Sequence, residues 1–254
     1  MSLTRIILKF SLMVWVFIIS SCEDTQSNKN KKTQSTNDSI KKVKSQLGQK
    51  KVLTHDTLTQ SIDTKTTIKD SGTKLTNQNV IEFMTTYGVK NPETIVKITT
   101  RYGSFIIELY KKTPIHRANF IYLVKEGYFD ETFFYRAAKN FVIQGGNSDR
   151  KEMAQKRFEI GEYTLPQEPI AGLKHERGAV ALSKQWVDNP SNRATPYEFF
   201  VVVSKKGAHH LDGEHTIFGK VIKGMNVVDK ISNVPVDQSE WPKENIFITA
   251  KVIK

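Results

Sequence analysis

Residues 133–147 are the part of the chain whose side chains most clearly point to chemistry. They read FFYRAAKNFVIQGGN, with one arginine set among aromatic and aliphatic residues and followed by a glutamine and a Gly-Gly pair. Two β-prone runs, Phe133–Arg136 and Phe141–Gln144, flank a polar connection and predict a β-hairpin. Alternation along these strands is expected to turn the arginine, phenylalanine and glutamine toward one surface, where a cation meets an apolar pocket. The alternative is a plain hairpin that carries an ordinary surface arginine.

The spacing of these residues resembles the signature of the cyclophilins. In that family such an arginine, phenylalanine and glutamine line the site that isomerises peptidyl-proline bonds, so the resemblance implies catalytic roles for Arg136, Phe141 and Gln144. Tyr135 stands where the family usually has a histidine. A tyrosine still supplies a ring and a hydrogen-bonding group there, and bacterial cyclophilins tolerate it.

Four further segments resemble landmarks of the family, and they follow the family's order between residues 95 and 254. The segments are TPIHRANF (113–120), GAVALS (178–183), YEFFVV (197–202) and LDGEHTIFGKVIKGMNVV (211–228). The first resembles the family's first helix, the second resembles the strand that pairs with substrate, and the last is the closest match. An isolated Phe-Tyr-Arg would not favour this family, whereas the ordered set does.

The fold is expected to be mainly β. After residue 94, short strands recur between Gly, Asn, Asp and Pro turns, which favours a closed antiparallel barrel. The resemblance implies eight strands and a helix over each open end, at Pro114–Glu126 and Met225–Ile231. For the first of these helices, Thr113 is the expected N-cap and Gly127 the expected stop.

The resemblance also implies a role for each residue of the substrate site. Arg136 would donate a hydrogen bond toward the proline nitrogen, and Gln144 would orient the flanking backbone. The main chain of Ser183 and Lys184 would pair with an extended substrate. The apolar floor under the proline ring would consist of Phe141, Val142, Phe200 and Leu211, with His215 at its wall. A site of this kind needs no cofactor and no metal.

Two positions depart from the family's pattern in ways that bear on binding. Glu198 stands where a glutamine is customary, so its carboxylate would either compete with substrate by pairing with Arg136 or orient that guanidinium. His210 occupies the place of the tryptophan that commonly contacts cyclosporin. We expect substrate binding to persist there while binding of the drug weakens, because an imidazole offers less apolar area than an indole.

The net charge of +12 raises the question of a nucleic-acid partner. Eleven lysines against six acids fall in residues 23–75, and no zinc knuckle, aromatic RNA-binding motif or glycine-rich phosphate loop accompanies them. We therefore expect no nucleic-acid partner, and attraction to anionic lipid or a plain solvated surface explains the charge. A metal is not expected either, because His209, His210 and His215 lie on a loop without cysteine.

The first 21 residues are typical of a secretion signal. Arg5 and Lys9 accompany the apolar run Phe10–Ile19, which is short for a membrane span. Residues 19–22, Ile-Ser-Ser-Cys, then resemble a bacterial lipobox, in which the cysteine is acylated; the alternative is an uncleaved signal anchor. Cys22 is the only cysteine, so no intramolecular disulfide forms. We expect a protein that is lipid-anchored at the cell envelope, in the periplasm or at the outer membrane.

A tether and a short helix are expected between this anchor and the barrel. Residues 22–76 are rich in Lys, Ser and Thr and lack a sustained apolar period, so they predict a disordered tether. Residues 77–93 predict a short amphipathic helix, with Asn77 or Asn79 as its cap and Gly88 as its stop. This helix would either pack on the barrel or bind a partner.

The isomerase domain is expected to span residues 94–254. Within it, residues 150–174 are longer and more charged than the same region of compact cyclophilins, and the sequence predicts no conformation for them.

Two functions of different classes are compatible with these residues. The first is a monomeric, lipid-anchored prolyl isomerase that assists the folding of proline-containing clients outside the cytoplasm. The second is a module that binds proline peptides without turning them over. A pure binder would not need Arg136, so its presence favours the isomerase.

Overall fold

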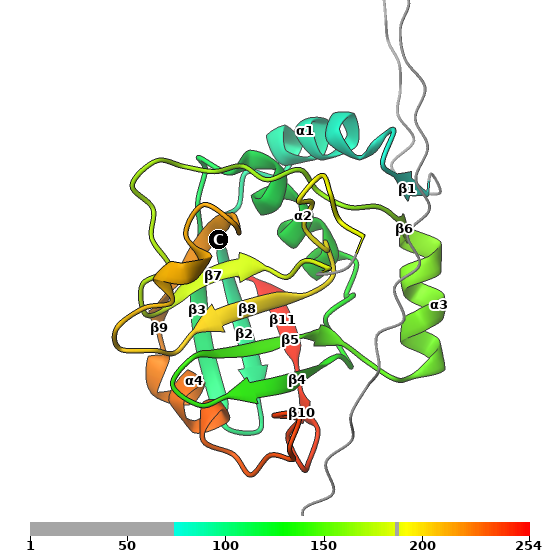
Figure 1. Cartoon of the computed structure of the whole chain (residues 1–254). Helices are drawn as coiled ribbons and strands as arrows, with labels where there is room; N and C mark the ends of the chain where they lie inside the picture. The colour runs from blue at the N-terminus through cyan, green and yellow to red at the C-terminus, as the bar shows by residue number, and fades with distance from the viewer. Residues whose placement is uncertain (1–73, 186–187) are drawn as a thin grey trace, which may run out of the picture. The chain divides into compact units, whose positions relative to one another are not determined.

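The computed structural model describes residues 74–185 and 188–254. Its central feature is one antiparallel sheet of nine strands that curls into a barrel (Figure 1). In their order across the sheet, the strands are β10 (Ile246–Phe247), β4 (Phe133–Ala138), β5 (Val142–Asn147), β8 (Phe199–Val202), β7 (Ala179–Leu182), β9 (Ile217–Lys223), β3 (Gly103–Leu109), β2 (Ile95–Thr100) and β11 (Thr249–Val252).

The barrel is nearly closed by its last strand. β10 pairs with β4 and β11 pairs with β2, so the two edges of the sheet meet along one C-terminal run. Ile248 separates β10 from β11, and its backbone N–H donates to the carbonyl oxygen of Thr132 at 2.8 Å. With β10 and β11 counted as one interrupted strand, the predicted eight-stranded antiparallel barrel is confirmed.

Two helices cover the ends of the barrel, as predicted. They are α2 (Pro114–Lys125) and α4 (Met225–Ser232), and Figure 1 shows them at opposite ends of the sheet. α2 ends where expected because Gly127 adopts a φ of 62° and its N–H donates to the carbonyl oxygen of Val124 at 3.0 Å.

The start of α2 is stabilised by a residue distant in sequence. The Thr113 side chain donates to the carbonyl oxygen of Tyr110 and makes no capping hydrogen bond to the helix. Instead, the carboxylate of Glu168 accepts the backbone N–H groups of Ile115 at 3.1 Å and His116 at 2.8 Å. An anion at this end also interacts favourably with the helix dipole.

Helix α1 (Val80–Lys90) packs on α2 through its apolar side. Val80, Met84 and Tyr87 are buried, and the Tyr87 ring lies 5.2 Å from that of Tyr122 on α2. The prediction that Gly88 ends the helix is wrong: α1 continues to Lys90.

Gly88 allows α1 and α2 to lie close together and does not form a turn. A side chain at this position would bring its Cβ within 3.0 Å of the Cβ of Ala118 on α2. The Gly88 carbonyl oxygen also accepts a hydrogen bond of 2.7 Å from the Arg117 guanidinium. Tertiary packing therefore overrides the local tendency of glycine to end a helix.

A third helix and a small second sheet complete the described residues. α3 (Lys151–Ile160) lies in the region for which the sequence predicted no conformation. It leads into β6 (Gly161–Glu162), which pairs in parallel with β1 (Leu75–Thr76). Leu75 is fully buried, so residues 75 and 76 belong to the folded part, contrary to the expected tether boundary at residue 76. The expected signal peptide, Cys22 and the tether up to residue 73 lie outside the described residues. None of the helices described is long and apolar enough to cross a membrane.

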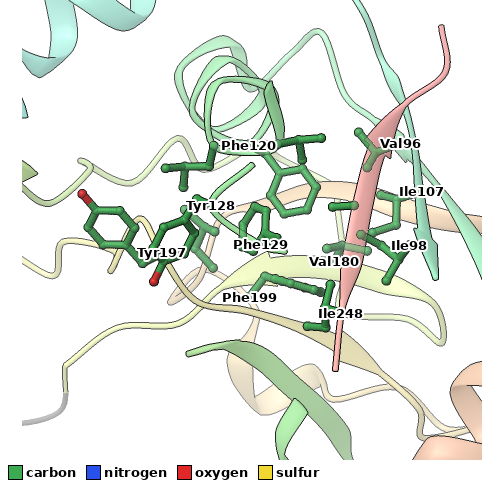
Figure 2. Close-up of a cluster of buried hydrophobic side chains, with 14 of the residues drawn as sticks. Val96, Ile98, Ile107, Phe120, Tyr128, Phe129, Val180, Tyr197, Phe199 and Ile248 are labelled. Carbon is green, nitrogen blue, oxygen red and sulfur yellow. The ribbon is translucent and has the colours of Figure 1, made fainter. Parts of the chain in front are cut away.

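The main core fills the barrel interior and the space beneath α2. Phe120 extends from α2 toward Phe129 and Phe199 (Figure 2), and its ring centroid lies 4.9 Å and 5.5 Å from theirs. The Phe218 ring also lies 5.3 Å from it. Aliphatic side chains surround these rings; those labelled in Figure 2 are Val96, Ile98, Ile107, Val180 and Ile248.

Alternation along the strands produces a second, smaller cluster on the opposite face of the sheet. In β8, Phe199 and Val201 belong to the main core, whereas Phe200 and Val202 belong to this smaller cluster. Successive side chains of a strand point to opposite faces, so a fully buried strand supplies both clusters. The other members of the smaller cluster are Ala138, Val142, Ala179, Ala181, Ala208, Leu211 and Ile217.

Candidate active site

A small pocket of about 60 Å³ opens above the smaller apolar cluster. It brings together side chains from the β4–β5 hairpin, from the ends of β7 and β8, and from the segment before β9. Its lining residues are Arg136, Phe141, Val142, Gln144, Ser183, Lys184, Phe200, Leu211 and His215. All of these were candidates from the sequence, so residues separated by nearly 80 positions meet at one site.

The β4–β5 hairpin places the three expected catalytic residues on one surface. Arg136 and Gln144 are direct partners across the ladder, and Phe141 lies just before β5. The centre of the Arg136 guanidinium is 5.7 Å from the Phe141 ring centroid, a distance at which a cation is attracted to the ring face. The spatial grouping predicted from the spacing is therefore present, while the catalytic roles themselves stay a prediction.

The Arg136 guanidinium is held by a carboxylate that the sequence analysis missed. Its Nε donates to Oε2 of Glu240 at 2.8 Å. Both side chains are partly exposed, at 36% for Arg136 and 42% for Glu240. The sequence around the hairpin does not predict this contact, because Glu240 lies 104 positions further along the chain.

Glu198 does not pair with Arg136, so both roles expected for it toward that arginine are wrong. One of its oxygens accepts the hydroxyl of Tyr135 at 2.8 Å, and the other accepts the side-chain amide of Asn147 at 3.0 Å. Burial and the nearby Glu198 carboxylate raise the pKa of Tyr135 above its usual value. Tyr135 therefore stays neutral at physiological pH and acts as a hydrogen-bond donor to Glu198.

Gln144 is fixed by a side chain at the end of β7. Its Nε2 donates to Oγ of Ser183 at 2.7 Å. The backbone N–H of Ser183 already donates to the Glu198 carbonyl at 2.9 Å, and its carbonyl oxygen accepts from Thr195 at 2.7 Å. Both backbone groups of Ser183 therefore bond within the protein, and the expected pairing of substrate with the main chain near Ser183 and Lys184 stays a prediction.

The Lys184 side chain is tied to its own surroundings. Its Nζ donates to Asn192 at 2.6 Å and to the Glu214 carboxylate at 2.9 Å, and the side chain is only 7% exposed. Among the described residues that line the pocket, Arg136 is the cation with the more exposed side chain, at 36%.

His215 closes the pocket with a neutral ring. Its Nδ1 donates to the Leu182 carbonyl oxygen at 3.0 Å, and its ring meets that of Phe200 edge-on at 5.3 Å. Burial lowers the pKa of His215 to about 4, so the ring is uncharged at neutral pH. An uncharged ring suits an apolar pocket wall.

A second histidine, His175, supports the floor from below and was not anticipated. It is fully buried, its ring stacks on Phe200 at 6.0 Å, and its Nδ1 lies 2.9 Å from Oδ1 of Asp212. Burial raises the pKa of Asp212, but hydrogen bonds from His175 and His209 outweigh it and lower that pKa to about 2. Within the described residues, no group of three or more His, Cys, Asp and Glu side chains is placed to hold a metal ion.

His210 lies at the rim rather than in the pocket lining. Its ring centroid is 5.2 Å from that of Phe141, and the residue is exposed. This placement is compatible with a contact to a bound ligand above Phe141.

A larger hollow of about 680 Å³ lies beside the pocket and shares Lys184 with it. The wall formed by α3 consists of Met153, Ala154, Arg157 and Phe158. The hollow lacks Arg136, Phe141 and Gln144, so the smaller pocket is the better candidate for the chemistry.

The neutral state of His215 predicts that acid destabilises the protein. Between its ordinary pKa of 6.5 and about 4, the unfolded chain binds a proton that the folded chain does not. The free energy of unfolding should therefore decrease as pH falls through this window, by about 3 kcal/mol for a shift of this size. Urea unfolding at several pH values measures the effect.

A His215→Asn variant provides the matched comparison for this pH dependence. Its side-chain amide can still donate to the Leu182 carbonyl but does not titrate, so its stability should depend less on pH between 6.5 and 4. An unchanged pH dependence would show that another group is responsible.

Comparisons with known proteins agree with this geometry. The family model described as cyclophilin type peptidyl-prolyl cis-trans isomerase/CLD matches residues 95–252. The peptidyl-prolyl cis-trans isomerase of Acinetobacter baylyi is 36% identical over 171 residues, which cover 63% of this chain and 86% of that protein. Peptidyl-prolyl cis-trans isomerase-like 2 of Rhizopus delemar is 35% identical over 169 residues, which cover 66% of this chain but only 30% of that protein.

A solved structure gives the same result for the fold. The crystal structure of a Cryptosporidium parvum cyclophilin type peptidyl-prolyl cis-trans isomerase matches with a TM-score of 0.53 and 27% identity, over 64% of this chain and 98% of that one. The same protein has also been crystallised in the presence of the dipeptide Ala-Pro. The barrel, the pocket and these relatives together show that the chain belongs to the family of cyclophilin-type peptidyl-prolyl cis-trans isomerases.

Proposed function

We propose that this chain accelerates cis–trans exchange of X–Pro bonds in polypeptide clients, with Arg136 as the residue that lowers the barrier. The observation that carries the proposal is the Arg136 guanidinium beside an apolar floor, directly across the ladder from Gln144. The charged donor would meet the nitrogen of the X–Pro bond, and the apolar floor would hold the proline ring.

The apolar residues would hold the proline ring. Val142, Phe200 and Leu211 are almost fully buried, at 3%, 5% and 7% exposure, so their positions are fixed by packing. The neutral ring of His215 adds a wall that carries no charge to desolvate. With the ring held, only the carbonyl group that precedes the proline needs to rotate.

Arg136 would act on the electronic barrier. Rotation costs about 18–20 kcal/mol because the nitrogen lone pair is delocalised into the carbonyl group. In the twisted state the lone pair is localised on the nitrogen, where it can accept a hydrogen bond from the guanidinium. This bond is stronger in the twisted state than in either planar isomer, which is the condition for catalysis. No nucleophile, general base or cofactor takes part.

The remaining polar groups would align the client. Ser183 holds the Nε2 of Gln144 at 2.7 Å, which fixes the amide with its oxygen as the acceptor for a client N–H. The large hollow beside Lys184 gives the extended client room to continue past the pocket.

An exchange assay on a proline tetrapeptide separates this function from the alternative of a proline-peptide-binding module. An isomerase raises the rate above the uncatalysed exchange, which takes tens to hundreds of seconds. A pure binder would shift the cis–trans equilibrium in proportion to bound peptide without raising the rate. Absence of acceleration by the full chain would reject the proposed function.

We further propose that the protein works outside the cytoplasm, anchored by a lipidated Cys22, where it assists the folding of secreted clients. The pattern of residues 1–22, with an apolar run before Ile-Ser-Ser-Cys, supports this proposal. Two or more acyl chains on one cysteine give durable membrane attachment.

A Cys22→Ser variant is expected to lose this attachment. Serine has no thiol for acylation, so the variant should accumulate as an unprocessed precursor or as a product that partitions into the aqueous phase. Detergent phase partitioning of both forms measures the change. If the variant partitions as the wild type does, the anchor lies elsewhere.

A further inference from the structure

The turn formed by residues 237–241 brings a carboxylate to the Arg136 side chain. Glu240 is the residue of the turn that reaches it, and its Oε2 accepts from Nε of Arg136 at 2.8 Å. Three features of the turn hold this contact in place.

The turn is closed by its own hydrogen bonds. Oδ1 of Asp237 accepts the backbone N–H groups of Ser239 at 2.8 Å and Trp241 at 3.0 Å. The backbone N–H of Asp237 donates to the Trp241 carbonyl at 2.9 Å. An aspartate that accepts from residues two and four positions ahead fixes the conformation of the turn between them.

The turn is also docked on the strand that carries Arg136. The backbone N–H of Ala137 donates to the Glu240 carbonyl at 2.9 Å. The Trp241 ring packs against Phe133 at 5.7 Å and Tyr135 at 5.8 Å, both on β4. These contacts set the turn in register with β4, so Glu240 faces Arg136.

The backbone at Glu240 is in a conformation that favours glycine. Its φ is 62°, in the left-handed region where a Cβ is disfavoured. Glycine would fit this backbone better, so the glutamate has a conformational cost in the folded chain.

We propose that Glu240 is a positioning residue, which orients the Arg136 guanidinium for isomerisation; the inference rests on the proposed role of Arg136. A carboxylate bound to Nε fixes the orientation of the guanidinium plane. Without it, the arginine side chain would sample many rotamers and many orientations of that plane. In the described part of the chain, Nε is the only guanidinium nitrogen of Arg136 with a hydrogen-bond partner, which leaves the two terminal nitrogens of this pocket-lining residue available as donors.

The test uses the full chain and a Glu240→Gly variant. This change removes the carboxylate and relieves the left-handed backbone, so the melting temperature should stay the same or rise. Loss of a partly exposed charge-assisted hydrogen bond should lower kcat by about tenfold while KM for a proline tetrapeptide changes little. A variant that is stable and keeps the kcat of the wild type would overturn the inference, as would a loss confined to KM.

Two comparisons separate positioning from a general effect. Glu244 pairs with Arg101 at 2.8 Å on the same segment, so Glu244→Gly serves as the control for Glu240→Gly and should keep full activity. In an Arg136→Ala background, Glu240→Gly should change kcat/KM by less than about twofold, because coupled residues are not additive. An equal loss with and without Arg136 would show that Glu240 does not act through it. Absence of isomerase activity in the wild-type chain would instead reject the proposed function, and this inference with it.

Discussion

Replacement of Arg136 by alanine is expected to lower kcat/KM for a proline tetrapeptide by roughly 10- to 150-fold, since a hydrogen bond to a charged group contributes about 1.5–3 kcal/mol. The fall should lie mainly in kcat, because the guanidinium is proposed to act on the twisted state rather than on bound ground states. Exchange kinetics on the full chain, followed over a range of peptide concentrations, separate kcat from KM.

Arg101→Ala is the matched control for this substitution. Arg101 is also a partly exposed arginine paired with a glutamate, Glu244, but it lies outside the pocket lining. It should retain the activity of the wild type. If Arg136→Ala retained it as well, the apolar pocket alone would account for turnover and the proposed mechanism would be wrong.

The features that could be predicted from sequence are those fixed by neighbours in the chain. Arg136 and Gln144 face each other because the hairpin connecting them is short, and a short hairpin sets the strand register. The strands and α2 follow from runs of β-prone residues and from Pro114 and Gly127 at the helix ends. The ordered landmarks after residue 95 then predicted the barrel that these elements form.

The features that could not be predicted depend on contacts between distant segments. Glu240 meets Arg136 across 104 residues, and Glu168 caps α2 from 52 residues beyond His116. Local sequence gives no information on which surface a carboxylate in a later turn reaches. For Glu198 the sequence predicted a contact with Arg136 that the structure lacks. Its hydrogen bonds go to Tyr135 and Asn147 instead.

Gly146→Ala is expected to disrupt the frame of the site. Gly146 has a φ of 99°, and a Cβ there would fall against the Tyr197 carbonyl oxygen and 3.3 Å from the Glu198 Cα. The left-handed backbone disfavours alanine by roughly 1–2 kcal/mol and the crowding adds about 1–3 kcal/mol, so the free energy of unfolding should fall by about 2–5 kcal/mol. Displacement of the Glu198 backbone should also weaken the contacts of Glu198 with Tyr135 and Asn147 and lower kcat. Urea unfolding and the exchange assay measure the two effects.

Gly172→Ala isolates the backbone part of this effect. Gly172 has a φ of 85°, but a Cβ there would have no neighbouring atom within 4 Å. Its substitution should therefore cost only the roughly 1–2 kcal/mol of the left-handed conformation and leave kcat unchanged. The difference between the two variants measures how tightly the 197–198 backbone is packed against β5. An equal loss of unfolding free energy in both variants would mean that the 197–198 backbone moves aside at little cost. The backbone around the site would then be less rigid than its contacts imply.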